Sequence, residues 1–138
     1  MPNGIDLLLA DHRYVDELFD AFAASGEAAI AGQIVAALTA HDDAEQAVLY
    51  PFVGAIVGDA DAVQRSALAH SAVKEQIDRL KFQEGASLGA AVEALRALVQ
   101  EHVADEEENI LPALADQATP AQLDELGSRI LQAKQRGG

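Results

Sequence analysis

The chain contains no cysteine. Disulfide bonds, zinc–thiolate sites, iron–sulfur clusters and thiol nucleophiles are therefore excluded. Aromatic residues are also scarce, at 4% of the 138 residues, although half of all residues are hydrophobic. Alanine, leucine and valine must therefore fill most of the core. Because alanine and leucine are strong helix formers, this composition favours an all-helical protein.

Basic residues are few as well: 9 Lys and Arg stand against 23 Asp and Glu, which gives a formal net charge of −14. Such a surface repels phosphate backbones and anionic lipids, so we expect no nucleic-acid partner and no membrane partner. Neither a secretory signal nor a long apolar run is recognised. By default the sequence predicts a cytoplasmic protein with a single domain over residues 1–138.

Apolar residues recur with helical spacing through most of the chain, as at Leu8, Val15 and Phe19. This pattern predicts an all-α fold, with four long helices within residues 5–112 and an additional short C-terminal helix. The predicted helices cover residues 5–24, 27–49, 61–84, 87–111 and 120–134.

The predicted helix ends depend on proline and on N-capping residues. Pro51 and Pro112 are each expected to end a helix, because proline lacks a backbone N–H and disfavours helix for the residue before it. Residues 52–60 are then a connection with at most one helical turn. Ser87 is the predicted N-cap of the fourth helix, and Thr119 that of the fifth.

Four histidines stand one on each long helix, and each falls on that helix's apolar stripe: His12, His41, His70 and His102. A single histidine in such a place is more often a core residue with a satisfied hydrogen bond. Burying four imidazoles without partners, however, would cost about 1–3 kcal/mol each. A ligand shared by the four imidazoles removes that cost.

Two glutamates accompany two of these histidines. Glu45 follows His41 by four residues and Glu106 follows His102 by four, so each pair shares one helix face. An ionised carboxylate on an apolar stripe needs a counter-charge. The two pairs belong to an internal repeat, HDDAEQAVLYP and HVADEEENILP, which begins at those two histidines. The chain therefore consists of two halves with similar sets of metal-binding groups.

The ligand types narrow the choice of metal. Four imidazoles and two carboxylates suit iron best, and manganese or zinc less well. Two bridging carboxylates favour a pair of ions over a single one. The Glu-x-x-His motif of ferritin-like di-metal proteins and the His-Glu-x-x-His motif of zinc peptidases are absent from the sequence.

The pattern resembles the hemerythrin-like, or HHE cation-binding, family over nearly the whole chain. The six residues that carry the resemblance are His12, His41, Glu45, His70, His102 and Glu106. The resemblance implies an up-down-up-down four-helix bundle in one hemerythrin-like domain. It also implies an oxo- or hydroxo-bridged pair of iron ions, with the two glutamates bridging the irons.

One position departs from the oxygen-carrying hemerythrins, which have a second histidine four residues after that of the third helix. Lys74 stands there in this chain, so the site is one imidazole short. Lys74 could point outward and pair with an acidic neighbour, or hydrogen-bond to a bound ligand. Tyr50 could fill the gap as a phenolate ligand or act as a proton carrier. Its ring could instead lie in the core, with its hydroxyl contacting a residue behind the ligands.

Most other acidic residues, Asp42 and Glu107 among them, are predicted to lie on solvated faces. Asp11, Asp16 and Glu101 could instead orient the imidazoles by hydrogen bonding. Two six-coordinate ions offer about twelve positions. The histidines, the bridging glutamates and one bridging oxygen fill about ten, and a tyrosine would leave one vacancy.

Two functional classes remain open. A site that is short of one imidazole favours ferric iron, and a diferric centre can decompose hydrogen peroxide in a catalase-like reaction. The alternative is O2 or NO binding, or iron or oxygen sensing, without turnover. A purely structural bundle does not explain the histidines. The predicted partners are small oxidants (H2O2, O2 or NO), and the chain is predicted to be a monomer or a weak homodimer.

Overall fold

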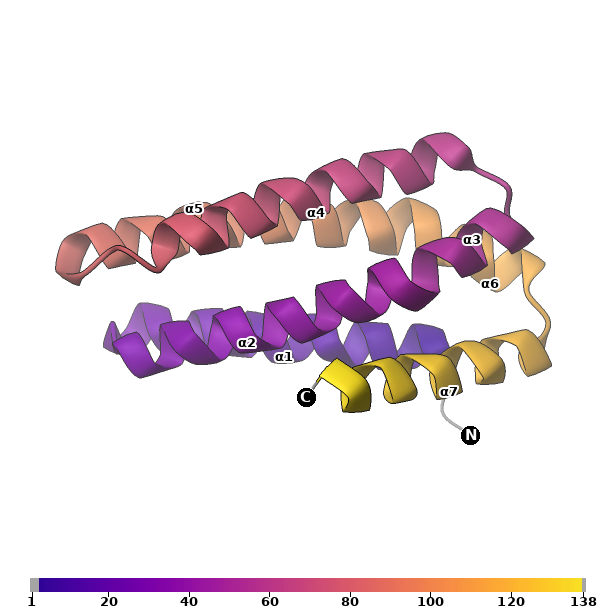
Figure 1. Ribbon diagram of the computed structural model, residues 1–138, viewed down its shortest axis with the longest axis horizontal. Helices are drawn as coiled ribbons and strands as arrows, with labels where there is room; N and C mark the ends of the chain where they lie inside the picture. The colour runs from indigo at the N-terminus through magenta and orange to yellow at the C-terminus, as the bar shows by residue number, and fades with distance from the viewer. Residues whose placement is uncertain (1–2, 138) are drawn as a thin grey trace.

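Four long helices form an antiparallel bundle in the computed structural model, which describes residues 3–137 (Figure 1). Helix α1 (Gly4–Ser25) pairs with α2 (Ala28–Ala44), and α4 (Ala60–Leu80) pairs with α5 (Gly85–Asp105). The two pairs pack face to face with their helices alternating in direction (Figure 1). This arrangement confirms the predicted all-α fold and the up-down-up-down bundle.

The second and fourth bundle helices are longer than predicted, because each continues through its proline. A π-helical segment, η1 (Glu45–Leu49), joins α2 to α3 (Tyr50–Ile56), and a second one, η2 (Glu106–Ile110), joins α5 to α6 (Leu111–Gln117). The prediction that the two prolines end these helices is therefore wrong. A π turn has a wider ring than an α turn, which leaves room for a proline ring just beyond it.

A fifth long helix, α7 (Pro120–Gly137), runs along the α1–α2 side of the bundle (Figure 1). Its start has the capping geometry expected at Thr119: the Gln122 N–H donates to Thr119 Oγ1 over 3.1 Å, and the Thr119 N–H donates to the Gln122 side chain over 2.8 Å. At Gly4 the helices α1 and α7 come so close that a Cβ atom on this residue would overlap the side chain of Leu126. The helix is longer than the predicted range of 120–134.

Two other helix ends differ from the prediction. Helix α4 ends at Leu80, not at residue 84. Helix α5 begins at Gly85 after Glu84, whose side chain makes no capping bond, so Ser87 lies inside the helix and is not its N-cap. The end of α1 follows the usual rule, since Gly26 adopts the left-handed conformation with φ of 68°.

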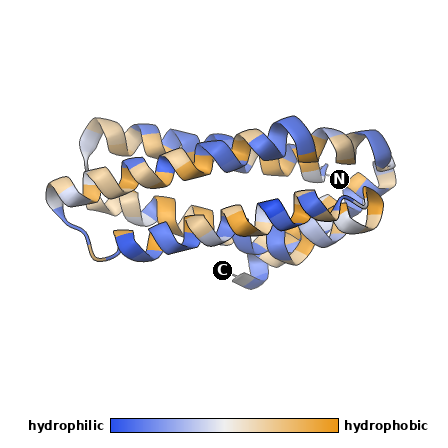
Figure 2. Cartoon of the chain, turned by 90° about the horizontal axis from the view of Figure 1, so that it is seen from above, coloured by the Kyte–Doolittle hydropathy of each residue, from blue (hydrophilic) through white to orange (hydrophobic). Residues whose placement is uncertain are grey.

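The apolar core consists of two clusters that are separated along the bundle by a buried polar layer. One cluster surrounds Leu49, Leu114 and Leu126 near α7, and the other surrounds Ile34 and Leu95 towards the opposite end. Figure 2 shows hydrophobic residues recurring along each helix between hydrophilic ones. No helix in the described part of the chain combines the length and the hydropathy needed to cross a membrane.

Candidate metal centre

The polar layer contains all six residues singled out by the sequence pattern. His12 comes from α1, His70 from α4, and the two His–Glu pairs from the junctions α2–η1 and α5–η2. Every one of the six side chains is buried, and both glutamates are fully buried, at 0% exposure. One turn of each helix therefore supplies the centre, as the stripe positions predict.

The ligand atoms form two groups, which we call half-sites. Half-site one consists of His12 Nε2, His41 Nε2, Glu45 Oε2 and Glu106 Oε1. Half-site two consists of His70 Nε2, His102 Nε2, Glu45 Oε1 and Glu106 Oε2. Each carboxylate thus gives one oxygen to each half-site, which is the arrangement of a bridging carboxylate.

The spacing within each half-site fits a metal ion. In half-site one the two nitrogen–oxygen distances, His12–Glu106 and His41–Glu45, are both 3.2 Å. In half-site two the distances His70–Glu45 and His102–Glu106 are 3.0 and 3.3 Å. Two ligand atoms that each lie about 2.1 Å from one ion, at right angles, are about 3.0 Å apart.

Unsatisfied buried atoms also point to a cation. All four ligand atoms of half-site one are buried and make no hydrogen bond among the described residues: His12 Nε2, His41 Nε2, Glu45 Oε2 and Glu106 Oε1. Buried polar atoms without partners are costly and uncommon in native proteins. A metal ion between them would satisfy all four at once.

The pKa shifts of the candidate ligands also indicate that the centre favours a cation. Burial alone would lower the pKa of His12, but its contact with Glu106 raises it. Burial likewise opposes the charge on His102, yet Glu106 and Glu45 raise its pKa to about 10. Burial raises the pKa of Glu45, but the charge of His41 and the hydrogen bonds to this carboxylate together hold it well below its usual value. The centre therefore favours positive charge, which either protons or metal ions can supply.

Groups behind the imidazoles orient three of the four rings. The Nδ1 atom of His41 lies 2.9 Å from an Asp11 oxygen, which also contacts Lys134 of α7. The Nδ1 atom of His12 lies 2.6 Å from Glu107. These contacts aim Nε2 at the centre, as is usual for histidines that bind metal.

The histidines of half-site two have fewer groups behind them to orient their rings. The Gln46 amide lies 3.3 Å from Nδ1 of His70, and an oxygen of Asp42 lies 3.8 Å from it. The Nδ1 atom of His102 has no hydrogen-bond partner in the described structure. Half-site one is therefore backed by two carboxylates at hydrogen-bond distance, and half-site two by one amide.

Tyr50, the first residue of α3, reaches the centre and lies against half-site two. Its hydroxyl oxygen is 2.8 Å from His70 Nε2 and 3.2 Å from His102 Nε2. The same hydroxyl donates to Glu106 Oε2 over 3.1 Å and to Glu45 Oε1 over 3.3 Å. All four of these atoms belong to half-site two, so the phenol could supply that half-site with a fifth ligand.

The π turn explains how Tyr50 comes to face the centre. In an α-helix a residue five positions after Glu45 would point about 140° away from it around the axis. In η1 the Tyr50 N–H donates to the carbonyl of Glu45, so the turn closes over five residues and the two side chains share a face. In the second repeat Leu111 bonds to Glu106 in the same way and is buried.

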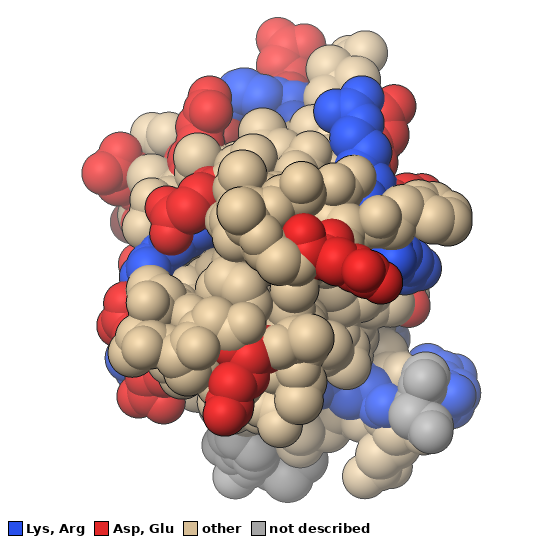
Figure 3. Space-filling view, turned by 90° about the vertical axis from the view of Figure 1, so that its left-hand side faces the viewer, with Lys and Arg blue, Asp and Glu red and all other residues tan. Residues whose placement is uncertain are grey.

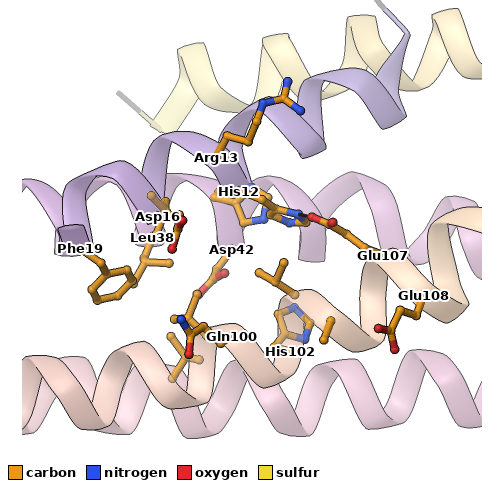
Figure 4. Close-up of a pocket in the computed structure, with 16 residues that line it drawn as sticks. His12, Arg13, Asp16, Phe19, Leu38, Asp42, Gln100, His102, Glu107 and Glu108 are labelled. Carbon is orange, nitrogen blue, oxygen red and sulfur yellow. Dashed lines mark hydrogen bonds and ion pairs between the residues drawn. The ribbon is translucent and has the colours of Figure 1, made fainter.

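A cavity of about 410 Å³ leads from the surface to the centre. Apolar side chains such as Val73 and Val99 line it, together with His12, His102 and the Asp42 carboxyl. Figure 4 shows His12 and His102 on opposite sides of this cavity, with Asp42 between them. Burial raises the pKa of Asp42 to about 6. A small molecule could therefore reach the metal position past a group that exchanges protons near neutral pH.

Several sequence expectations need correction at this point. Asp42 was expected on a solvated face, yet it is partly buried and lines the cavity. Glu107 is exposed, as expected, but it also contacts His12. Of the three candidate orienting residues, Asp11 contacts a ligand, whereas Asp16 pairs with Arg96 and Glu101 is exposed. Glu107 reaches His12 from another helix, so spacing along a single helix gave no signal for this contact.

Lys74 is exposed. It lines a separate polar cleft, which His70 also lines. The predicted alternative in which it points outward therefore fits its position. Ser66, which the sequence reasoning missed, is fully buried one turn before His70. Its spacing of four residues from that histidine could have identified it.

Fold and site together define a helical bundle with a buried His/Glu metal-binding site typical of a di-metal centre. Residues 3–114 match the family described as Hemerythrin HHE cation binding domain. The chain belongs to this family, as the resemblance in the sequence implied.

Two similar proteins have been identified. A DNA nickase from Nostoc sp. strain PCC 7120 is 28% identical over 137 residues, which cover 95% of this chain but 39% of that protein. The chain thus spans about two-fifths of the length of this relative. The crystal structure of a hemerythrin HHE cation binding domain-containing protein from Mycobacterium kansasii has the same fold. Its TM-score is 0.86 at 19% identity, over 99% of this chain and 87% of the other.

Proposed function

We propose that this protein is a non-haem di-iron protein that decomposes hydrogen peroxide. The observation that carries this proposal is the asymmetry of the centre: a phenol lies against half-site two, while the cavity is lined by both histidines of half-site one and by His102 alone of half-site two. The metal ligands are then the four histidines and the two glutamates, with Tyr50 as a further ligand of half-site two.

Iron fits this set of donors best. Imidazoles suit several transition metals, whereas carboxylates and a phenolate are hard ligands that favour ferric iron. A bound iron pair supplies two-electron exchange, by which one H2O2 is oxidised to O2 and a second is reduced to two waters. A centre held in the ferric state is unsuited to reversible O2 carriage, which needs a stable ferrous form.

The chain's own residues would admit the substrate and handle its protons. The apolar wall at Val73 and Val99 presents no charge to a neutral molecule such as H2O2. The oxidation of one peroxide releases two protons, and the reduction of the next one consumes two. Asp42, with its pKa raised by burial to about 6, is placed in the cavity to hold a proton between these steps.

DNA cleavage, which the name of the Nostoc relative suggests, has less support for this chain than peroxide decomposition. A protein that cuts DNA must approach a dense row of phosphates, and this chain has a net charge of −14. On the end of the bundle shown in Figure 3, Lys and Arg are scattered among Asp and Glu and do not gather into a basic patch. Binding of O2 or NO without turnover stays as the second candidate, because it would use the same open position.

The test is oxygen evolution after H2O2 is added to protein loaded with iron, normalised to bound iron. We expect sustained release of one O2 for every two H2O2 consumed. The matched control is the same protein loaded with zinc, which also binds nitrogen and oxygen donors but has no redox chemistry. His41→Ala, which removes a ligand of half-site one, should also lose the activity.

The proposal fails if protein with two bound irons releases no O2. Binding of O2 or NO to the reduced protein, followed by its absorption spectrum, would then decide whether the second candidate function holds.

A further inference from the structure

The cavity beside the candidate metal centre is much larger than hydrogen peroxide requires. Its volume is about 410 Å³. H2O2 is little larger than a water molecule, whose share of the liquid volume is about 30 Å³. Cavities of about 300–1,000 Å³ are typical of sites that bind organic molecules. The space next to the centre is therefore sufficient for a molecule with a carbon skeleton.

This cavity has a polar end and an apolar end. The candidate ligands His12, His41 and His102 line the polar end. The apolar end consists of buried side chains that stand three residues, or seven for the phenylalanine, from the histidine of their own helix: Val15, Phe19, Leu38, Val73 and Val99. Because the helices alternate in direction, all five fall on one side of the polar layer, in the apolar cluster around Ile34 and Leu95.

The apolar end extends along the bundle and not across it. His12 and Phe19 both line the cavity and are seven residues apart on α1, which corresponds to about 10 Å along the helix axis. Figure 4 shows Phe19 and Leu38 displaced along the bundle from the two histidines that it labels. A molecule with a polar group at one end and an extended aliphatic chain fits such a space.

The mouth of the cavity lies between α1 and the segment formed by α5 and η2. Its exposed lining residues include the carboxylates of Asp16, Glu107 and Glu108, against the single guanidinium of Arg13. An excess of negative charge at an entrance disfavours anions, such as the carboxylate of a fatty acid. The charge of the mouth therefore favours a neutral ligand.

We propose that the cavity binds neutral aliphatic hydroperoxides, with the –OOH group beside the ligand histidines and the carbon chain against Val15, Phe19 and Val73. The reaction rests on the proposed function, because H2O2 supplies the electrons. One H2O2 loses two electrons and two protons and leaves as O2. These reduce the hydroperoxide, whose O–O bond breaks to give an alcohol and water. The balanced reaction is ROOH + H2O2 → ROH + H2O + O2.

The first test is the binding of unreactive alcohols, from ethanol to 1-hexanol, to the zinc-loaded protein by calorimetry. Each CH2 group that leaves water for the apolar end should raise the affinity about fourfold. This measurement needs no redox chemistry, so it does not depend on peroxide decomposition. An affinity that does not change with chain length would overturn the proposal.

Val73→Phe and Val92→Phe form a matched pair for this binding test. Both valines are 2% exposed, but only Val73 lines the cavity. Val73→Phe should lower the affinity for 1-hexanol about tenfold or more, because the carbon chain would stay partly in water. Val92→Phe should leave that affinity unchanged, and the affinity for ethanol should be the same in both variants. Equal losses for 1-hexanol in the two variants would overturn the proposal.

Val73→Ala extends the binding test in the opposite direction. It enlarges the apolar end, so the affinity should continue to rise at chain lengths where that of the wild type has stopped rising. If both proteins stop at the same length, the chain does not lie against Val73 and the proposed orientation is wrong.

The second test is the conversion of n-hexyl hydroperoxide by iron-loaded protein in the presence of H2O2. Decomposition of H2O2 alone releases one O2 for every two H2O2, whereas the exchange releases one O2 and forms one hexanol for each H2O2. Protein that releases O2 from H2O2 but forms no hexanol would overturn the hydroperoxide as a substrate. Protein that releases no O2 from H2O2 would overturn the proposed function and the exchange reaction together, and the alcohol series would then decide the binding alone.

Discussion

The two half-sites have the same bridging glutamates and one pair of imidazoles each, yet their surroundings differ. Half-site one is backed by the carboxylates of Asp11 and Glu107 behind its histidines, and both of those histidines line the cavity. Half-site two has the Tyr50 phenol within 3.3 Å of its ligand atoms and the buried Ser66 one turn before His70. An internal repeat has thus produced two unequal metal positions.

The two half-sites differ in the position of their additional negative groups relative to the metal ligands. At half-site one the extra charge lies outside the imidazoles, where it orients the rings and would leave a coordination position of a bound metal open. At half-site two a phenolate would bring the charge to the metal itself and close that position. We therefore expect changes at the two half-sites to have separable effects.

The largest expected effect follows from removal of a bridging carboxylate. Glu45→Ala takes one oxygen from each half-site, and we expect bound iron to fall from two ions per chain to less than one. His12→Ala removes a ligand of half-site one alone, so one iron should remain, together with the phenolate band, which is the absorption band expected of a Tyr50 phenolate bound to ferric iron. Metal analysis together with absorption spectra measures both quantities.

Glu108→Ala, an exposed change in the same helical segment, is the control for this comparison. If His12→Ala also loses the phenolate band, the two half-sites do not bind metal independently, and the predicted difference between them is wrong.

A smaller effect should follow from the loss of an orienting group. Asp11→Ala removes the partner of His41 Nδ1, and loss of such a partner typically lowers metal affinity about 10- to 100-fold. Gln46→Ala, at half-site two, should cost less because an amide carries no charge. Competition with a chelator gives both affinities, and Glu125→Ala, which breaks an exposed pair with Arg129 away from the cavity, serves as the control. A greater loss of affinity in Gln46→Ala than in Asp11→Ala would mean that half-site two, not half-site one, depends more on its orienting group.

The smallest effect is expected from narrowing the cavity. Val99→Phe places a larger ring in the cavity wall and should slow peroxide decomposition a few-fold without changing the phenolate band. Val92→Phe enlarges a buried valine of the same helix that does not line the cavity. Each change should destabilise the fold by about 1–3 kcal/mol through overpacking. Equal slowing in both variants would mean that substrate reaches the metal by another route.

Most of the fold could be predicted from the sequence because apolar spacing records which face of a helix is buried. Leu8, Phe19 and Leu95, for example, stand at stripe positions and are all in the core. The two prolines misled the prediction, since a proline usually ends an α-helix. It does not do so after a π turn, and local sequence patterns do not distinguish the two cases.

The same spacing predicted the candidate ligands, because His41 with Glu45 and His102 with Glu106 need only one helical turn to meet. Residues that act across helices were harder to find. Glu107 meets His12 from a different helix, and neighbours in the sequence do not reveal that contact. Tyr50 could be suggested from its place in the repeat, but its approach to half-site two depends on the widened turn.

The π turn occurs in both halves of the bundle, so the two halves of the centre differ through side chains and not through the backbone. Both turns bring the residue five positions after the glutamate towards the interior, and the chain places Tyr50 at one of them and Leu111 at the other. If Tyr50 binds the metal of half-site two as proposed, this single pair of side chains determines which metal position is closed and which stays open. Exchange of the two residues would then be expected to reverse that order while the helices keep their places.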